Sequence, residues 1–314
     1  MSGETGYRKA EDIIREVGKV VVGKDGVLIK TLLAILAGGH ILMEDIPGVG
    51  KTTMAVAFSR ALGLNYNRVQ FTPDVLPSDI TGYSVYDKNS GNMIYQPGAV
   101  LTNLFLADEL NRATSRTQSA LLEAMEEGQV TVDGRTYEVP RPFVVIATQN
   151  PTGAKGTQML PDSQLDRFMI RLSIGYPDRD SEIEMIRRKQ SGITTTSVNQ
   201  VADRPAVTAM RGEVSSVYIK DSIISYIIDL VAATRNHPMV LQGASPRASV
   251  AVAAMAKATA WIQGRDYVTP KDVRFVFRDT VEHRLLWVPE AEAAGRHAGV
   301  TDEILSSVPA PKIG

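Results

Sequence analysis

The chain has 314 residues, with 34 Lys and Arg against 35 Asp and Glu, which gives a formal charge of −1 at neutral pH. An apolar share of 44% and a charged share of 22% are usual for a folded globular chain, so they exclude an intrinsically disordered protein. The near-zero net charge argues against a broad basic surface for nucleic acid, and the absence of cysteine excludes disulfides and thiolate metal sites.

The first part of the chain alternates between predicted helices and predicted strands. In chain order, the patterns indicate an amphipathic stretch over 10–22, a strand over 39–44, a helix over 54–62, strands over 66–71 and 104–107, a helix over 115–127, and strands over 143–147 and 168–174. Thr114 or Ser115 can cap the 115–127 helix, and Gly128 can end it. Because parallel strands need crossover connections, this alternation predicts an α/β fold with a parallel sheet.

Two predicted hairpins interrupt the alternation. Residues 83–95 alternate around 88–91, and residues 129–137 alternate around Asp133-Gly134, a typical two-residue hairpin turn. Tyr83, Tyr86 and Tyr95 on the first hairpin are candidates for exposed contacts, although a hairpin can also pack its own aromatic side chains.

The character of the sequence changes after Gly192. Residues 191–204 are polar and rich in Thr and Ser, which predicts a linker. Helices are expected over 221–235 and 246–263, and Thr269-Pro270 should open another that runs to about Leu286. The last 25 or so residues, weakly periodic, predict a surface helix or a tail.

No targeting or membrane segment is expected. The start of the chain, 1–13, carries several charges and has no apolar signal segment. The longest stretch without a charge, 89–107, contains Pro97 and Gly98, which does not fit a membrane-spanning helix. We therefore expect a cytoplasmic protein without a membrane span, of one large domain or two.

A glycine-rich turn lies between the strand predicted at 39–44 and the following helix. It reads Pro47-Gly48-Val49-Gly50-Lys51-Thr52-Thr53. In such a loop the glycines let backbone N–H groups approach phosphate oxygens, Lys51 reaches the β- and γ-phosphates, and Thr52 can hold Mg²⁺. The full pattern has Gly where this chain has Asp45. The alternative is a plain glycine turn with an exposed lysine.

Two carboxylates end the apolar run at 104–107. On the same sheet as a phosphate loop, Asp108 is expected to hold Mg²⁺ and Glu109 to act as the base that polarises the attacking water. The alternative is that both residues only cap the segment that follows.

These motifs and several others occur in the order found in AAA+ ATPases, and over about residues 10–286 the chain resembles the MoxR family. The resemblance rests on residues 44–52 (EDIPGVGKT), 70–82 (QFTPDVLPSDITG), 107–126 (ADELNRATSRTQSALLEAME), 147–151 (ATQNP), 165–168 (LDRF) and 245–247 (SPR). It implies a P-loop AAA+ core with a five-stranded parallel sheet and two β-hairpin inserts, over residues 1–195, followed by a helical lid domain over 205–314.

The resemblance also implies roles for single residues. Asn150 matches sensor 1, which orients the attacking water or contacts the γ-phosphate; a turn residue is the alternative. Arg167 matches the arginine finger, which enters the ATP site of a neighbouring subunit, or else forms a structural salt bridge. Arg247 matches sensor 2, which reaches back to the same phosphate, unless it is only an exposed arginine at a helix start.

Val22 and Gly23 match the segment that packs on adenine, although ordinary turn packing also fits. Arg112 is a further candidate for an inter-subunit contact or a solvated side chain.

The family resemblance implies a Mg²⁺-dependent ATPase that assembles as a homo-oligomer, expected to be a hexameric ring, and acts as a chaperone-like remodeller. Its partner is expected to carry a von Willebrand factor A domain. Alternatives are an ATP-gated scaffold with incidental turnover and a nucleic-acid motor or chelatase-like subunit. Neither hairpin interleaves aromatic and basic residues, which argues against nucleic acid as the partner.

Overall fold

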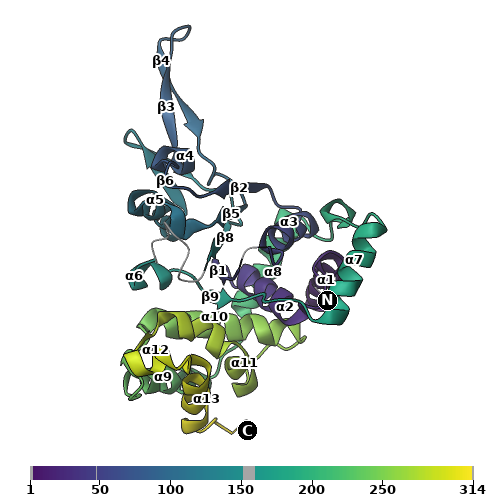
Figure 1. The fold of residues 1–314 in the computed structure, drawn as a ribbon, viewed down its shortest axis with the longest axis vertical. Coiled ribbons are helices and arrows are strands. Elements are labelled where there is room, and N and C mark those ends of the chain that lie inside the picture. The colour runs from purple at the N-terminus through teal and green to yellow at the C-terminus, as the bar shows by residue number, and fades with distance from the viewer. Residues whose placement is uncertain (1–2, 47, 151–159, 313–314) are drawn as a thin grey trace.

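The fold is seen in a computed structural model that describes residues 3–46, 48–150 and 160–312, so Pro47 and Pro151 of the predicted motifs lie outside it. Its centre is a five-stranded sheet in which every pairing is parallel, as the alternation of strands and helices predicts (Figure 1). In spatial order the strands are β2 (Tyr66–Gln70), β5 (Leu104–Asp108), β8 (Val144–Gln149), β1 (Ile41–Glu44) and β9 (Ile170–Leu172).

Both faces of the sheet are covered, and the strand residues alternate between two apolar clusters. Ile41 and Met43 point into a cluster with α1 (Gly3–Gly18), α2 (Asp25–Leu36) and α3 (Lys51–Ala61), whereas Leu42 points into a cluster with α5 (Ser115–Glu127). This is the period of two expected of a strand. Since helices cover both faces, the sheet is the middle layer of three, and its strand ends are the edges at which loops can build a site.

The two hairpins form where they are predicted. The first, β3 (Gly82–Asp87) with β4 (Asn92–Pro97), follows the short helix α4 (Pro77–Thr81) and projects away from the body (Figure 1). The second pairs β6 (Gln129–Val132) with β7 (Arg135–Glu138).

The aromatic side chains of the first hairpin divide between exposure and packing. Tyr83 and Tyr86 are exposed, at 51% and 59% of their surface. Tyr95 instead stacks on Tyr137 of the second hairpin, with 3.7 Å between the ring centres. Tyr83 and Tyr86 are therefore exposed and open to contacts, whereas Tyr95 joins the two hairpins.

The segment predicted as a linker is partly packed. After α7 (Arg179–Gln190), the chain makes a short 3-10 turn, η2 (Thr195–Ser197), and then buries Val198 and Ala202 in the main core. The backbone N–H groups of Val201 and Ala202 both donate to the carbonyl oxygen of Ala61, at the end of α3. The segment is therefore a mostly exposed connection between two helices, as predicted, but its few apolar residues pack against the main core.

The last part of the chain is mostly helical. Its first helix, α8 (Arg204–Ser216), packs against α2 and α10. The elements that follow lie below the sheet in Figure 1, and they are α9 (Asp221–Arg235), β10 (Val240–Gln242), α10 (Pro246–Ile262), α11 (Pro270–Val281), η3 (Glu282–Arg284), β11 (Leu286–Trp287), α12 (Pro289–Ala293) and α13 (His297–Ser307). The helix expected to reach Leu286 ends at Val281. Of the two alternatives expected for the end of the chain, a helix forms over 297–307, and α13 buries Val300 and Ile304. Within the described ranges, no helix is long and apolar enough to cross a membrane.

Candidate functional site

The glycine-rich turn connects β1 to the first residue of α3. Gly48 and Gly50 have φ angles of +88° and +97°, which other residues rarely adopt. A Cβ added to either glycine would meet nothing within 4 Å, so the space beside the loop is open. Gly50 is the N-cap of α3 and has no side chain to satisfy the free N–H groups of the first turn. This arrangement favours the binding of an anion such as phosphate.

Lys51, the first residue of α3, is buried beneath this loop. Its Nζ donates a hydrogen bond to the carbonyl oxygen of Asp45, at 2.7 Å. Burial lowers the pKa of Lys51, and the negative charges of Asp45, Asp108 and Glu109 oppose that shift. The lysine is therefore a cation surrounded by carboxylates, held at the edge of the sheet where the phosphate loop opens.

Asp108 ends β5 at the same edge of the sheet. Its Oδ1 accepts a hydrogen bond from the hydroxyl of Thr148, at 2.7 Å, and its Oδ2 pairs with the guanidinium of Arg68, at 2.7 Å. Thr148 belongs to β8 and Arg68 to β2, the two strands on either side of β5. The strand order thus brings both partners to the predicted metal-binding carboxylate.

Glu109 lies one residue further, in a left-handed backbone conformation with φ at +57°. Its backbone N–H donates to the hydroxyl of Thr148, at 2.8 Å. Its Oε1 accepts from Nδ2 of Asn150, at 3.1 Å, and its Oε2 pairs with Arg112, at 2.8 Å. The pKa of Glu109 is lowered, chiefly by the hydrogen bond from Arg112. The structure therefore brings together Glu109 and Asn150 and holds the carboxylate in its charged form.

The residues expected to hold Mg²⁺ fit what that ion accepts. The described residues contain no cluster of three or more metal-binding side chains of the His, Cys, Asp or Glu type. Mg²⁺ at nucleotide sites is usually held by one or two carboxylates together with substrate phosphates and water, so such a cluster is not required. Asp108 offers a carboxylate, and Thr52 offers a hydroxyl on the first turn of α3. Because Arg68 pairs with Oδ2 of Asp108, Arg68 would have to leave this oxygen before the oxygen could bind Mg²⁺.

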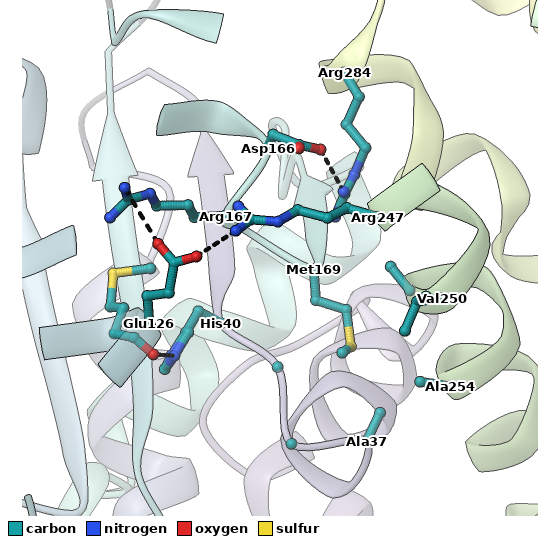
Figure 2. Close-up of a pocket in the computed structure, with 14 residues that line it drawn as sticks. Ala37, His40, Glu126, Asp166, Arg167, Met169, Arg247, Val250, Ala254 and Arg284 are labelled. Carbon is teal, nitrogen blue, oxygen red and sulfur yellow. Dashed lines mark hydrogen bonds and ion pairs between the residues drawn. The ribbon is translucent and has the colours of Figure 1, made fainter. Parts of the chain in front are cut away.

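Arg167 and Arg247 lie at the other edge of the sheet. Arg167 precedes β9, which runs parallel to β1, whereas the phosphate loop follows β1. The four residues of β1 span roughly 13 Å. Within one chain, therefore, neither arginine is brought to Lys51. Both pair instead with the carboxylate of Glu126, the Arg167 contact measuring 3.2 Å, beside a pocket of about 460 Å³ (Figure 2).

The helical part of the chain fixes the segment that carries Arg167. Asp166 pairs with Arg284, at 2.6 Å (Figure 2). It also accepts a hydrogen bond from the hydroxyl of Ser245, the N-cap of α10. Arg284 also donates to the carbonyl oxygen of Phe168, at 2.7 Å, and its own side chain is only 3% exposed. Residues 166–168 are thus held from the helical side, which sets the direction in which Arg167 points.

Val22 and Gly23 form the turn between α1 and α2. Gly23 has a φ of +69°, and a Cβ added there would lie 2.0 Å from the hydroxyl of Ser181 in α7. The need for glycine at this position is explained by turn packing alone. A contact between this turn and adenine stays a prediction.

Several residues of the site were not predicted. Thr148 could have been found, because it lies near the carboxyl end of a strand beside β5 and the carboxyl ends of parallel strands share an edge. Arg68 was harder to identify as a site residue, because its only sign in the sequence is a charge within a predicted strand. Glu126 gave none, since its role depends on how the end of α5 meets the start of α10.

Comparisons with known proteins agree with this fold. Residues 40–170 match the ATPase family associated with various cellular activities (AAA), and residues 232–307 match the AAA lid domain. Among solved structures, a crystal structure from Cytophaga hutchinsonii, of a protein named for an expected ATPase activity, superposes with a TM-score of 0.92. The two share 40% sequence identity, over 99% of this chain and 97% of the other.

Curated relatives span most of the chain. The uncharacterized protein YeaC of Bacillus subtilis is 44% identical, over 95% of this chain and 93% of its own length. The chaperone MoxR1 of Mycobacterium tuberculosis is 38% identical, over 90% of this chain and 77% of its own length. The protein MoxR of Methylorubrum extorquens is 30% identical, over 95% and 94%.

Proposed function

This chain belongs to the MoxR family of AAA+ ATPases, and on that premise we propose that it hydrolyses ATP, with Mg²⁺, at sites shared between neighbouring copies in a ring. The observation that carries the proposal is the convergence of Lys51, Asp108 and Glu109 at the open end of the phosphate loop. That constellation supplies a cation for the phosphates, a carboxylate for the metal and a carboxylate for the attacking water.

Each residue has a part in the proposed reaction. The backbone N–H groups of residues 48–53 bind the phosphates, and Lys51 balances their charge. Thr52 and Asp108 would hold Mg²⁺, which when bound neutralises charge on the phosphate oxygens. Glu109 orients the attacking water, and Asn150 holds Glu109 in place by the hydrogen bond already described.

The position of the two arginines supports completion of each site by a neighbour. Arg167 and Arg247 pair with Glu126 at the edge of the sheet opposite the phosphate loop of their own chain, so a second copy is the source of ATP that they could reach. The Nε of Arg167 is buried without a hydrogen-bond partner among the described residues, which leaves a donor of the guanidinium unused. A planar cation beside the γ-phosphate would stabilise the charge that develops there.

The wider role follows from the family. One relative named as a chaperone supports a remodelling function, and we propose a partner that carries a von Willebrand factor A domain. In the same proposal the ring is a hexamer, residues 1–195 bind the nucleotide and residues 205–314 act as the lid. The exposed Tyr83 and Tyr86 make the first hairpin the candidate to contact the client.

Steady-state phosphate release tests the proposed reaction. The full chain should release phosphate from ATP with Mg²⁺, and removal of divalent cations with EDTA should abolish the release. Lys51→Ala should have the same effect as EDTA, because it removes the cation that balances the phosphates. Phosphate release that persists with EDTA, or in the Lys51→Ala protein, would contradict the assignment of this site.

A further inference from the structure

Asp45 is the residue by which this chain departs from the full phosphate-loop pattern, and its side chain is buried. Its Oδ2 accepts hydrogen bonds from the backbone N–H groups of Ile174 and Gly175, at 2.5 and 2.7 Å, and from the hydroxyl of Ser173, at 3.2 Å. Its Oδ1 accepts from the N–H of Ile46, at 3.1 Å. Glycine, which the pattern has at this position, could make none of these bonds.

The segment that Asp45 holds is the connection from β9 to α7, and this connection contacts the turn of residues 22–24. The carbonyl oxygen of Tyr176 accepts a hydrogen bond from Nζ of Lys24, at 2.8 Å. Ser181, on the first turn of α7, fills the space beside Gly23. A continuous chain of contacts therefore runs from Asp45 through residues 173–181 to the turn expected on the adenine side.

Asp45 also contacts the phosphate side of the site. Its carbonyl oxygen accepts the hydrogen bond from Nζ of Lys51, at 2.7 Å. One residue thus bonds through its backbone to the lysine of the phosphate loop and through its carboxylate to the segment that leads to residues 22–24.

We propose that Asp45 is a positioning residue of the ATP site, which fixes the phosphate loop at a set distance from the turn of residues 22–24. The inference rests on the proposed ATPase function and on that turn being the adenine side. Without the carboxylate, the loop still has the glycine pattern that binds phosphate, but the two sides of the site are no longer held together. A ligand that contacts both sides loses affinity, whereas a ligand that contacts only the loop does not.

Binding measured by titration calorimetry separates these two cases. The probes are the magnesium complexes of ATPγS, which has phosphates and base, and of inorganic tripolyphosphate, which has phosphates alone. In Asp45→Gly we expect the dissociation constant for ATPγS to rise about tenfold, the loss expected for charge-assisted hydrogen bonds that order the site. The constant for tripolyphosphate should change by less than about threefold. Equal losses for both probes, or no loss for either, would overturn the inference.

Two more conservative variants allow the same binding test if Asp45→Gly does not fold. Asp45→Asn keeps one acceptor oxygen without its charge, and Ser173→Ala removes one of the three donors to Oδ2. Each should weaken ATPγS by about threefold and leave tripolyphosphate unchanged. Loss of affinity for tripolyphosphate in these variants would also overturn the inference.

A matched control makes the same chemical change elsewhere. Asp203, the N-cap of α8, accepts a hydrogen bond from the N–H of Ala206, at 2.9 Å, so Asp203→Gly also removes a carboxylate bound to backbone. It should not alter binding of either probe, and an effect equal to that of Asp45→Gly would overturn the inference. If the unaltered chain fails to bind ATPγS, the proposed function itself is wrong. That outcome is distinct from a loss of affinity in the Asp45 variants, whether for ATPγS alone or for both probes.

Discussion

Arg167 and Arg247, from distant parts of the sequence, pair with the same carboxylate, that of Glu126. Arg167 precedes β9 and Arg247 lies on the first turn of α10, so the contact joins the sheet to the helical part of the chain (Figure 2). Two guanidinium groups this close repel each other unless an anion lies between them. In the single chain Glu126 is that anion.

Glu126→Gln therefore leaves the two arginines without their anion, and the fold should lose stability. The loss should be about 1 kcal/mol or less in the free energy of unfolding, because all three side chains are partly exposed. It should shrink in about 0.5 M NaCl, which screens the repulsion. Urea unfolding at low and high salt measures this. Glu123→Gln, an exposed change on the same helix, should be neutral at both. Equal stabilities of the Glu126→Gln and unaltered chains at low salt would show that the pairs contribute nothing.

Glu109→Gln should separate binding from turnover. We expect phosphate release to fall by at least about a hundredfold, the usual contribution of a base, while ATPγS still binds. Phosphate release and titration calorimetry on one preparation give both numbers. Glu127→Gln, an exposed change at the end of α5, is the matched control and should keep full turnover. Unchanged turnover in Glu109→Gln would mean that Glu109 is not the base. If partner activation survives in that variant although turnover is lost, the scaffold alternative is favoured.

Asp166→Asn should destabilise the fold because it leaves the buried guanidinium of Arg284 without its anion. Breaking such a pair from one side costs about 3 kcal/mol in the free energy of unfolding. The double variant Asp166→Asn with Arg284→Met should lose less, since no unpaired charge stays buried. Asp302→Asn breaks an exposed pair with Arg278 and serves as the matched control in urea unfolding. If Asp166→Asn lowers the free energy of unfolding no more than Asp302→Asn does, the pair of Asp166 with Arg284 does not stabilise the fold as proposed.

The pH dependence of stability should contain a contribution from His40. This histidine is largely buried, accepts a hydrogen bond at Nδ1 from the N–H of Val145 and donates from Nε2 to the carbonyl oxygen of Met125. Burial lowers its pKa from 6.5 to about 4. Between those values the unfolded chain binds a proton that the native chain excludes, so stability falls as the pH drops from 6.5 to 4.

The loss attributable to His40 is at most roughly 3 kcal/mol. Thermal unfolding across this pH range should show a shallower decline in His40→Gln than in the unaltered chain. Some decline should persist, because burial also lowers the pKa of His283. An identical slope in both proteins would mean that His40 does not titrate in this range.

The sequence was most informative where local chemistry decides the structure. The helix predicted over 115–127 has those bounds in the structure, because Thr114 caps it and Gly128 adopts the left-handed conformation that ends it. The Asp133-Gly134 turn and all five strands of the sheet were also located, since their patterns are strong. The motif order gave the family, and the structure brought Glu109 and Asn150 into contact.

The sequence was least informative where packing decides the structure. Helices α2, α7 and α8 were not predicted. In α2 seven of its twelve residues are buried, so it has no polar face to create a helical period. In α7 none of the described side chains is buried, so the apolar signal is too weak. Two sets of contacts join segments that are far apart in the chain, so no local sequence pattern predicts them. Arg167 and Arg247 share a carboxylate partner, and Asp45 contacts residues 173–175.

The sharing of each ATP site between two copies is tested most directly by mixing two inactive variants. Lys51→Ala cannot bind the phosphates but keeps Arg167, and Arg167→Ala keeps the phosphate loop but lacks the arginine. In a one-to-one mixture that forms rings, about one quarter of the sites combine an intact loop with an intact arginine from the neighbour. We predict phosphate release at about one quarter of the unaltered rate. Release no greater than the sum of the two variants alone, at concentrations where light scattering shows mixed rings, would contradict a site completed by a second copy.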